Sequence, residues 1–314
     1  MKPIGGFFEL EHSASADAVL PGAGAVNFGR AGLELILRRR CYGKVWLPEY
    51  ICPVVFALMN RLEIPWQTYP LDSNFEPIAP HRTSAREAFL YVNYFGVKDD
   101  CCRRLEKEAD NLILDLTQAF FYEPEAGIDG FNSARKFFGV PDGAFVFGEG
   151  LDAASLPEST SWNGCEALLR RLDNDLVGGY CAFQQHEKAM QEWQPAKMSR
   201  LTAALLGSID IHESRSRRCR NFATLHARLA PHNRISLDSD NIGPLCYPFL
   251  HPEGRVLKRR LIDRQIFTPT FWPGLESWLP LSRLVEDWID NLVCIPCDHR
   301  YSTRDMETII KEIL

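Results

Sequence analysis

The sequence lacks the features of a secreted, membrane or nucleic-acid-binding protein. Its first residues, MKPIGGFFELEH, contain no apolar stretch of the kind found in secretory signals. No uninterrupted apolar run is long enough to span a bilayer. The formal net charge is −6, whereas phosphate-backbone binding requires a basic surface. We therefore expect a cytoplasmic protein with reduced thiols that binds neither nucleic acid nor a membrane.

Several ligand-binding motifs are also missing. There is no Walker motif, and the glycines of PGAGAVNFG have the wrong spacing for a dinucleotide fingerprint. Cys294-x-x-Cys297, followed by His299, lacks a second pair of zinc ligands at a recognisable spacing. We predict no metal site and interpret this stretch as a strand end with small buried side chains. Basic runs such as Arg215–Arg220 are interpreted as solvated helix faces, with an anion site as the alternative.

What the chain does contain is an alternation of short apolar runs and amphipathic runs. Continuous apolar strands separated by helices predict a mostly parallel sheet that is covered on both faces. The predicted strands are Lys44–Pro48, Trp66–Asp72, Ala88–Phe95 and a strand that begins NLILD, and the predicted helices are Cys52–Leu62 and Asp99–Asp110.

The character of the sequence changes after Gly150. Helices are predicted at Ser161–Asp173 and, as one long helix, at Met198–Leu229, and LCYPFL and IFTPTFW are predicted to be strands. LVEDWIDNL and TRDMETIIKEIL are predicted to be helices. The 314 residues are enough for two domains. We predict a large α/β domain (1–195), a helical connector (196–232) and a small C-terminal α/β domain (233–314).

Asp115 closes the apolar run NLILD. A carboxylate at the carboxyl end of a buried parallel strand faces the crevice in which α/β proteins bind ligands. The alternative is a helix-capping or turn aspartate, since Thr117 and Gln118 follow it. Upstream, NFGRAGLELILRRR predicts a helix with Gly29 at its start. Free N–H groups and a positive dipole end would make that start an anion site, to which Arg30 would add charge.

Lys136 lies within FNSARKFFGVPDGAFVFGEG, three residues after Ser133 and among several aromatic residues. Burial among apolar groups disfavours the charged form of a lysine, and a free amine can form a Schiff base. The alternative is a snorkelling or ion-paired lysine. A lysine, a carboxylate and a helix start are the three parts that pyridoxal phosphate requires. Asp115 would keep the pyridine nitrogen protonated, and Lys136 would carry the proton between substrate Cα and cofactor C4′.

In this order, the three elements resemble the fold-type I pyridoxal-phosphate enzymes and, more closely, the DegT/DnrJ/EryC1/StrS aminotransferases. That family acts mainly on keto sugars attached to nucleotides. The resemblance runs from about Gly22 to the C-terminus, and its most specific part is Asp115-x-x-Gln118 followed by the lysine and a glycine hairpin. The stretches that carry it are FGRAGLELIL, VWLPEYICPVV, YVNYFGVKDD, LILDLTQAF, FNSARKFFGVPDGAFVF and IPCDHRYSTRDMETIIKEIL.

The resemblance implies a role for each matching residue. The phosphate loop would be formed by Gly29, Arg30 and Ala31, with Ser133 also on the phosphate. Asp115 would bind the pyridine nitrogen, Gln118 the 3-hydroxyl, and Lys136 would form the Schiff base. The resemblance also implies a homodimer with shared sites, in which a partner asparagine contacts the cofactor. KMSRLTAALL stands at that place here, so Ser199 or Arg200 would substitute.

The chain departs from the family pattern at several positions. Arg30 stands where the family has threonine, and Asn93 where it has histidine. The ring-stacking aromatic aligns near Cys52, so Tyr50 or Tyr94 could supply the stacking face. The resemblance predicts an aminotransferase that moves an amino group from an amino acid, expected to be glutamate, to a keto sugar nucleotide or another small carbonyl compound. Surface-polysaccharide or secondary-metabolite synthesis is the expected setting. The alternatives are a pyridoxal-phosphate lyase or dehydratase and a non-catalytic cofactor-binding protein.

Overall fold

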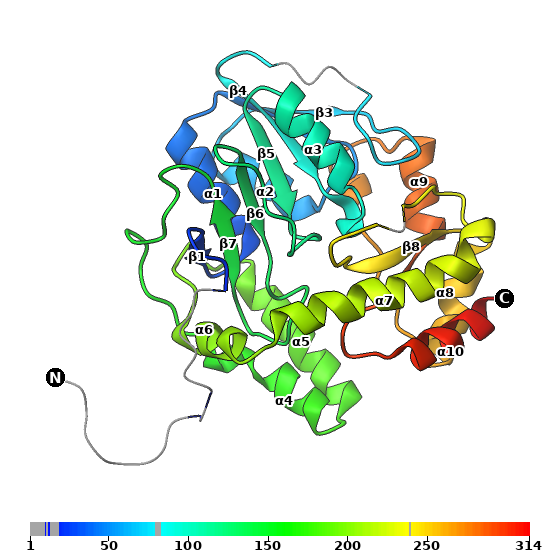
Figure 1. Cartoon of the computed structure of the whole chain (residues 1–314). Coiled ribbons are helices and arrows are strands. Elements are labelled where there is room, and N and C mark those ends of the chain that lie inside the picture. Colours follow the sequence, from blue (N-terminus) through cyan, green and yellow to red (C-terminus); the bar gives the residue numbers. More distant parts are fainter. Residues whose placement is uncertain (1–9, 11, 13–18, 79–82, 239) are drawn as a thin grey trace.

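A seven-stranded sheet forms the centre of the molecule (Figure 1). The computed structural model describes residues 10, 12, 19–78, 83–238 and 240–314. Strands β2 to β6 are parallel, and β7 is antiparallel to both of its neighbours, β6 and β1. The strand order is β1-β7-β6-β5-β4-β2-β3. The bounds are β1 (Gly24–Val26), β2 (Lys44–Pro48), β3 (Trp66–Tyr69), β4 (Glu87–Val92), β5 (Leu112–Leu116), β6 (Asp129–Asn132) and β7 (Ala144–Phe147).

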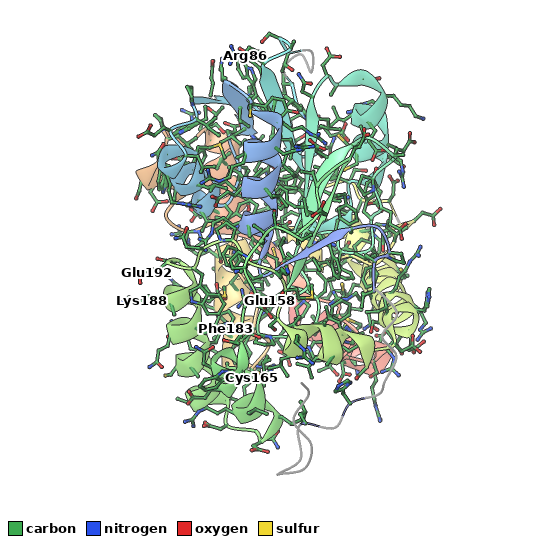
Figure 2. All side chains as sticks on the ribbon, turned by 90° about the vertical axis from the view of Figure 1, so that its left-hand side faces the viewer. Arg86, Glu158, Cys165, Phe183, Lys188 and Glu192 are labelled. Carbon is green, nitrogen blue, oxygen red and sulfur yellow. The ribbon has the colours of Figure 1, made fainter. Side chains whose placement is uncertain are left out.

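Helices cover both faces of this sheet. Figure 2 shows α1 (Gly29–Arg40) and α2 (Pro53–Arg61) on one side and α3 (Asp99–Glu108) on the other. The strand β5 is buried along its whole length, because a strand covered on both faces has no side that meets water. The predicted α/β fold with a mostly parallel sheet is confirmed.

A second sheet of two antiparallel strands, β8 (Cys246–Leu250) and β9 (Leu292–Pro296), forms the small α/β unit. Its side chains alternate between two apolar clusters, since successive residues of a strand point to opposite faces. Tyr247, Phe249, Val293 and Ile295 pack with α7 (Ile211–Leu229) and α10 (Thr303–Ile313). Cys246, Leu250, Leu292 and Cys294 join the core of the large sheet. The small sheet therefore connects the two cores.

The Cys294-x-x-Cys297 stretch ends β9, and both thiols are buried. The interpretation of this stretch as a strand end with small buried side chains is confirmed. Among the described residues, no group of three or more His, Cys, Asp and Glu side chains is placed to hold a metal ion.

Two secondary-structure predictions in the second half were wrong. The long helix expected at Met198–Leu229 is interrupted, because Asp210 caps a new helix by accepting a hydrogen bond from the Glu213 N–H at 2.8 Å. The helix before the break is α6 (Arg200–Gly207). The strand expected in IFTPTFW is absent from this described segment, since Pro269 cannot donate to a strand ladder.

The pattern did not predict the helix α5 (Leu176–Met190), whereas the helix α8 (Gly254–Asp263) contains the basic run at residues 258–260, which has a helical pattern. The helix α5 forms a hairpin with α4 (Glu166–Leu172), and this hairpin projects from one end of the molecule (Figures 1 and 2). The remaining elements are α9 (Arg283–Asn291) and the short 3₁₀ helices η1 (Tyr94–Gly96), η2 (Trp162–Gly164), η3 (Ala230–His232) and η4 (Leu275–Ser277).

The helix α7 runs from the large domain into the small one. Its Phe222, Leu225 and Leu229 belong to the apolar cluster around β8 and β9. The boundaries drawn at 195/196 and 232/233 stay a prediction. No helix in the described ranges is both long and apolar enough to cross a membrane.

Candidate active site

Four segments end or begin at one edge of the large sheet, the edge formed by the carboxyl ends of its parallel strands. They are the ends of β2, β5 and β6 and the start of α1, which follows β1. Ligands of open α/β sheets bind outside this edge. The topology therefore brings Cys52, Asp115, Ser133 and Gly29 to one region, although up to 104 positions separate them in sequence.

Asp115 is a buried carboxylate at this edge. Its Oδ1 accepts a hydrogen bond from the Thr117 N–H at 2.9 Å, so it is also the turn aspartate that the sequence offered as an alternative. Burial raises the pKa of Asp115, and the charge of Lys136 is the strongest influence that lowers it. The structure thus places the predicted carboxylate and the predicted lysine near enough for their charges to interact.

Lys136 lies on the connection between β6 and β7. Its Nζ donates a hydrogen bond to Thr117 Oγ1 at 3.0 Å. The expectation that neighbouring aromatics shield this lysine was wrong, because Lys136 is exposed in the single chain. Phe137 and Phe138 are buried and pack on Phe120, with ring centroids 5.7 and 5.0 Å apart. The buried rings therefore fix the connection between β6 and β7 to the core, whereas the Lys136 side chain stays exposed.

The start of α1 lies very close to the connection between β6 and β7 that carries Lys136, which we call the lysine loop. A Cβ at Gly29 would lie 2.8 Å from the Asn132 carbonyl oxygen and 3.0 Å from Thr117 Cγ2, so only glycine fits. Phe28, the capping residue, supplies no side-chain acceptor within the described residues. The Ala31 and Gly32 N–H groups donate to the Phe28 carbonyl oxygen at 2.9 and 3.3 Å. Within the described residues, the N–H groups of Gly29 and Arg30 therefore remain available for an anion beside Thr117. Ala31 is buried in this turn.

Arg30 is oriented differently from the expected phosphate contact. Its Nη2 donates a hydrogen bond to the Met190 carbonyl oxygen at 2.6 Å, at the last residue of α5. Burial, followed by the nearby charge of Arg61, lowers the pKa of Arg30. Arg30 joins α1 to the end of α5, where helix carbonyls favour a cation, and its predicted contact with phosphate stays a prediction.

Only one of the two polar atoms of the buried Gln118 side-chain amide has a hydrogen-bond partner among the described residues. Its Oε1 accepts a hydrogen bond from the Phe95 N–H at 2.6 Å, whereas its Nε2 has no partner among the described residues. A buried polar group without a partner costs about 1–3 kcal/mol and usually marks a missing ligand or water. The donor suits a ligand oxygen such as a ring hydroxyl. Ser133, directly after β6, is buried as well.

Cys52 lies in the site, and the two tyrosines do not. Burial raises the pKa of the Cys52 thiol, and the charge of Lys136 is the first influence against it. Tyr50 and Tyr94 are fully buried, with ring centroids 5.8 Å apart. The Tyr50 hydroxyl donates to the Phe271 carbonyl oxygen, and the Tyr94 hydroxyl donates to the Tyr50 carbonyl oxygen at 2.6 Å. Neither tyrosine has a free ring face, so the stacking role proposed for them is not supported.

Asn93 has a structural position beside α3. Its Nδ2 donates to Asp99 Oδ1 at 2.7 Å, and its Oδ1 accepts from the Lys98 N–H at 3.0 Å. The side chain is fully buried. It fixes the start of α3 and does not face Lys136.

Ser199 is satisfied inside its own chain. Its Oγ donates to Asp142 Oδ1 at 2.8 Å and accepts from the Thr202 N–H at 3.1 Å, while its own N–H donates to Asp142 Oδ2 at 3.0 Å. A buried residue with these bonds cannot reach the site of a partner, so the role predicted for Ser199 is wrong. Arg200 is exposed and remains the candidate.

Thr117 is a site residue that was not predicted from the sequence. Thr117 contacts Asp115, Lys136 and the start of α1. Its position inside Asp115-x-x-Gln118 was the only available signal, and a single polar residue there predicts nothing without the fold.

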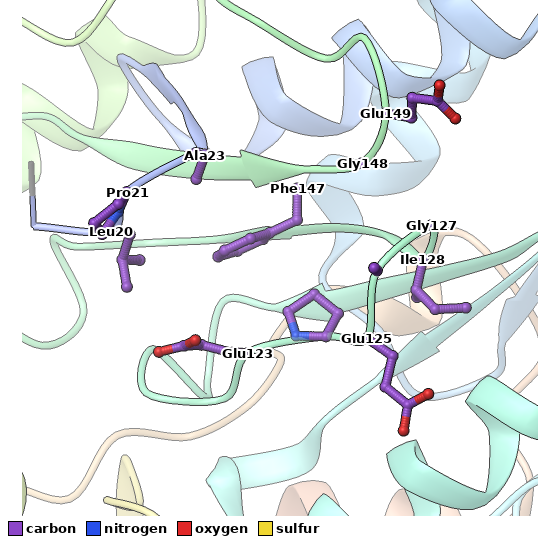
Figure 3. Close-up of a pocket in the computed structure, with 13 residues that line it drawn as sticks. Leu20, Pro21, Ala23, Glu123, Glu125, Gly127, Ile128, Phe147, Gly148 and Glu149 are labelled. Atoms are coloured by element: carbon purple, nitrogen blue, oxygen red, sulfur yellow. The ribbon is translucent and has the colours of Figure 1, made fainter.

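Two hollows on the described surface lie away from Lys136. One, of about 600 Å³, is at the opposite edge of the sheet, where Phe147 faces Leu20 and Glu123 (Figure 3). The other, of about 660 Å³, is on the α4–α5 hairpin and includes Trp162 and Arg170. Lys136 lines neither hollow, and its side chain is exposed in the single chain.

No family model matches this chain, and no curated protein matches it significantly. Solved structures do. An aminotransferase described as DegT DnrJ EryC1 StrS from Brucella abortus is 15% identical, with a TM-score of 0.63 over 93% of this chain and 84% of that one. DesI, crystallised with its TDP-sugar product, is 16% identical, with a TM-score of 0.61 over 93% and 79%.

A third similar structure is the PLP form of Spr1654, a sugar aminotransferase from Streptococcus pneumoniae by its description. It is 11% identical, with a TM-score of 0.59 over 93% of this chain and 86% of that one. Identities this low establish the architecture alone. The chain has the fold of the DegT/DnrJ/EryC1/StrS sugar aminotransferases, as the sequence predicted.

Proposed function

We propose that this protein is a pyridoxal-phosphate-dependent aminotransferase. The observation that carries the proposal is the meeting of three separate parts at one edge of the sheet. Lys136 and Asp115 lie near enough for their charges to interact, both bond to Thr117, and Thr117 packs against the start of α1. A lysine, a buried carboxylate and an uncapped helix start are the protein groups that this cofactor requires.

The residues present fit the cofactor. The start of α1 and Ser133 would hold the phosphate, Asp115 the pyridine nitrogen, and the unpartnered Nε2 of Gln118 the ring hydroxyl. Cys52 lies beside Lys136 and Asp115, where a ring face would be covered. When bound, pyridoxal phosphate supplies an electron sink for the pair released at the substrate Cα.

The chain's own groups would perform the proton chemistry. Lys136 Nζ would hold the cofactor through its aldehyde group and, as a free amine, would move a proton between the substrate Cα and the cofactor C4′. Asp115 would stay ionised beside a protonated ring nitrogen. Its burial, which disfavours an isolated charge, would then be offset by that cationic partner.

The substrate class is proposed from the structural neighbours. DesI was crystallised with a TDP-sugar product, and Spr1654 is described as a sugar aminotransferase. We propose an amino acid donor, glutamate first, and a keto sugar nucleotide or a related small carbonyl compound as acceptor. Polysaccharide or secondary-metabolite synthesis in the cytoplasm is the proposed setting.

We further propose that the protein acts as a homodimer. Lys136 is exposed in the single chain, whereas this chemistry requires a site from which water is excluded. A second chain placed over the carboxyl edge would cover the lysine. Arg200 is the exposed residue that would reach across to the partner's site.

Borohydride trapping tests the lysine assignment. Pyridoxal phosphate is added to the protein, the mixture is reduced with borohydride, and peptides are mapped by mass spectrometry. We expect the reduced cofactor on Lys136 and no trapped product in Lys136→Ala. Lys188→Ala, which removes a lysine on the exposed α5 helix, should trap as the wild type does. Trapping of the cofactor by Lys136→Ala at the wild-type level would contradict the assignment of Lys136.

A further inference from the structure

Thr117 is the residue that joins the parts of the site. Its N–H donates to Asp115 Oδ1 at 2.9 Å, and its Oγ1 accepts from Lys136 Nζ at 3.0 Å. The hydroxyl and the N–H of Thr117 both lower the pKa of Asp115, against the effect of burial. One residue therefore bonds to the carboxylate through its backbone and to the lysine through its side chain.

The direction of each hydrogen bond follows from the groups involved. A charged lysine has donors only, so the Thr117 hydroxyl must accept from it. The Thr117 N–H is a donor, so the Asp115 carboxylate accepts from it. The arrangement is a short chain from the Lys136 amine to the Thr117 hydroxyl and from the Thr117 N–H to the Asp115 carboxylate.

Packing restricts the rotamer of Thr117. Its methyl group, Cγ2, lies close to the start of α1, at 3.0 Å from the position that a Cβ on Gly29 would take. A β-branched side chain has few allowed rotamers. With the methyl group held against α1, the hydroxyl is turned toward Lys136. Serine would keep the hydroxyl without this restriction, and valine would keep the shape without the hydroxyl.

We propose that Thr117 is a positioning residue that holds the amino group of Lys136 beside Asp115 whenever the lysine is not joined to the cofactor. The inference rests on the proposed function. In the cofactor-free protein, Thr117 keeps the exposed lysine at the site and away from solvent-directed rotamers.

The test compares wild type, Thr117→Val and Thr117→Ser with two readouts. The first is the rate at which added pyridoxal phosphate becomes covalently joined, followed by its visible band. The second is labelling of Lys136 by an amine-reactive acetylating reagent in the cofactor-free protein, measured by mass spectrometry. Far-UV circular dichroism confirms that each variant is folded.

We expect Thr117→Val to capture the cofactor about tenfold more slowly, because a hydrogen bond to a charged group is lost. Thr117→Ser should stay within about twofold to threefold of wild type, since it keeps that bond. Lys136 should be labelled faster in Thr117→Val than in Thr117→Ser. Lys188, which does not contact Thr117, serves as the internal labelling control.

The outcomes separate the inference from the proposed function. If wild type never captures the cofactor, the proposed function fails, and the labelling of Lys136 still decides the role of Thr117. If wild type captures it and the valine variant matches wild type in both readouts, Thr117 does not position the lysine. If the valine variant does not fold, Thr117→Ala is compared with Thr117→Ser, and equal capture and labelling would overturn the inference.

Discussion

Lys136 and its aromatic neighbours occupy opposite environments within three residues. Lys136 is exposed, whereas Phe137 and Phe138 are buried in an aromatic cluster. The sequence predicted that the lysine and Asp115 serve one site, and in the structure both bond to Thr117. The sequence could not indicate exposure, because the direction of each side chain depends on how the loop packs on Phe120. The role of Thr117 was equally hidden, since it depends on the approach of α1 from about ninety positions earlier in the chain.

A prediction at the residue scale concerns Asp115 and pH. Its folded-state pKa lies above its usual value because the carboxylate is buried, so the folded protein binds this proton more tightly than the unfolded chain. The contribution of Asp115 to stability is thus fully present below its unfolded pKa, about 3.9, and is lost as pH rises through its folded pKa.

Asp115→Asn removes this titration and keeps the acceptor for the Thr117 N–H. In the cofactor-free protein, the variant should equal or exceed wild type in stability at pH 7, by roughly 1 kcal/mol for each unit of pKa shift. Denaturant unfolding at pH 4 and pH 7 measures the difference between the two proteins. A variant that is less stable than wild type at pH 7 by more than about 1 kcal/mol would contradict this account of the site.

At the scale of elements, the helix α7 carries both surface arginines and a buried arginine. Arg217 and Arg220 pair with Glu213 at the surface, as the solvated-face interpretation predicted. Arg218 is 1% exposed, so the interpretation was wrong for this residue. Its guanidinium donates to the carbonyl oxygens of Pro244 and Phe137, at 3.0 Å each. Helical periodicity shows which face of a helix is apolar. It does not show that an arginine side chain will be buried there and will bond to carbonyl oxygens of other segments.

Arg218 therefore fastens the lysine loop to the small domain. Arg218→Met should lower the free energy of unfolding by about 2–4 kcal/mol, since it leaves buried carbonyl oxygens without donors. Arg217→Met, one position away on the same helix, is the matched control and should change it by no more than about 1 kcal/mol. Urea denaturation followed by circular dichroism gives both values, and equal losses in the two variants would refute the role of Arg218.

Hydrophobic periodicity predicted some helices and strands and missed other features. The helices α2 and α3 and the strands β2, β4 and β5 were predicted close to their observed bounds, because each has a clear apolar pattern. The break at Asp210 and the absence of a strand around Pro269 depend on one capping residue and one missing N–H. Such single-residue effects do not alter the average pattern of a segment.

At the scale of the whole molecule, the exposed apolar side chains are unevenly distributed. Many lie on the hairpin formed by η2, α4 and α5, and no residue of α4 is buried. The hairpin is fixed to the lysine loop by the Arg135–Glu187 ion pair and by His186 on the Pro141 carbonyl oxygen at 2.9 Å. The exposed side chains are Trp162, Leu169, Leu172, Leu176, Val177, Tyr180 and Phe183.

An exposed apolar surface of this kind and an exposed lysine both favour an assembly larger than one chain. We predict that sedimentation equilibrium gives twice the 35.8 kDa mass of a single chain. Cofactor capture per chain should fall on dilution below the dissociation constant of the dimer. A monomer that captures the cofactor with a concentration-independent yield would contradict the proposed homodimer.

The most direct test of the central claim is the visible absorption spectrum of the cofactor-loaded protein before and after glutamate is added. An aminotransferase should show the band of a cofactor joined to Lys136, and glutamate should convert it to the spectrum of the pyridoxamine form. A band that neither glutamate nor any other amino acid changes would contradict transamination and leave a cofactor-binding protein. No band after addition of pyridoxal phosphate would contradict the cofactor assignment itself.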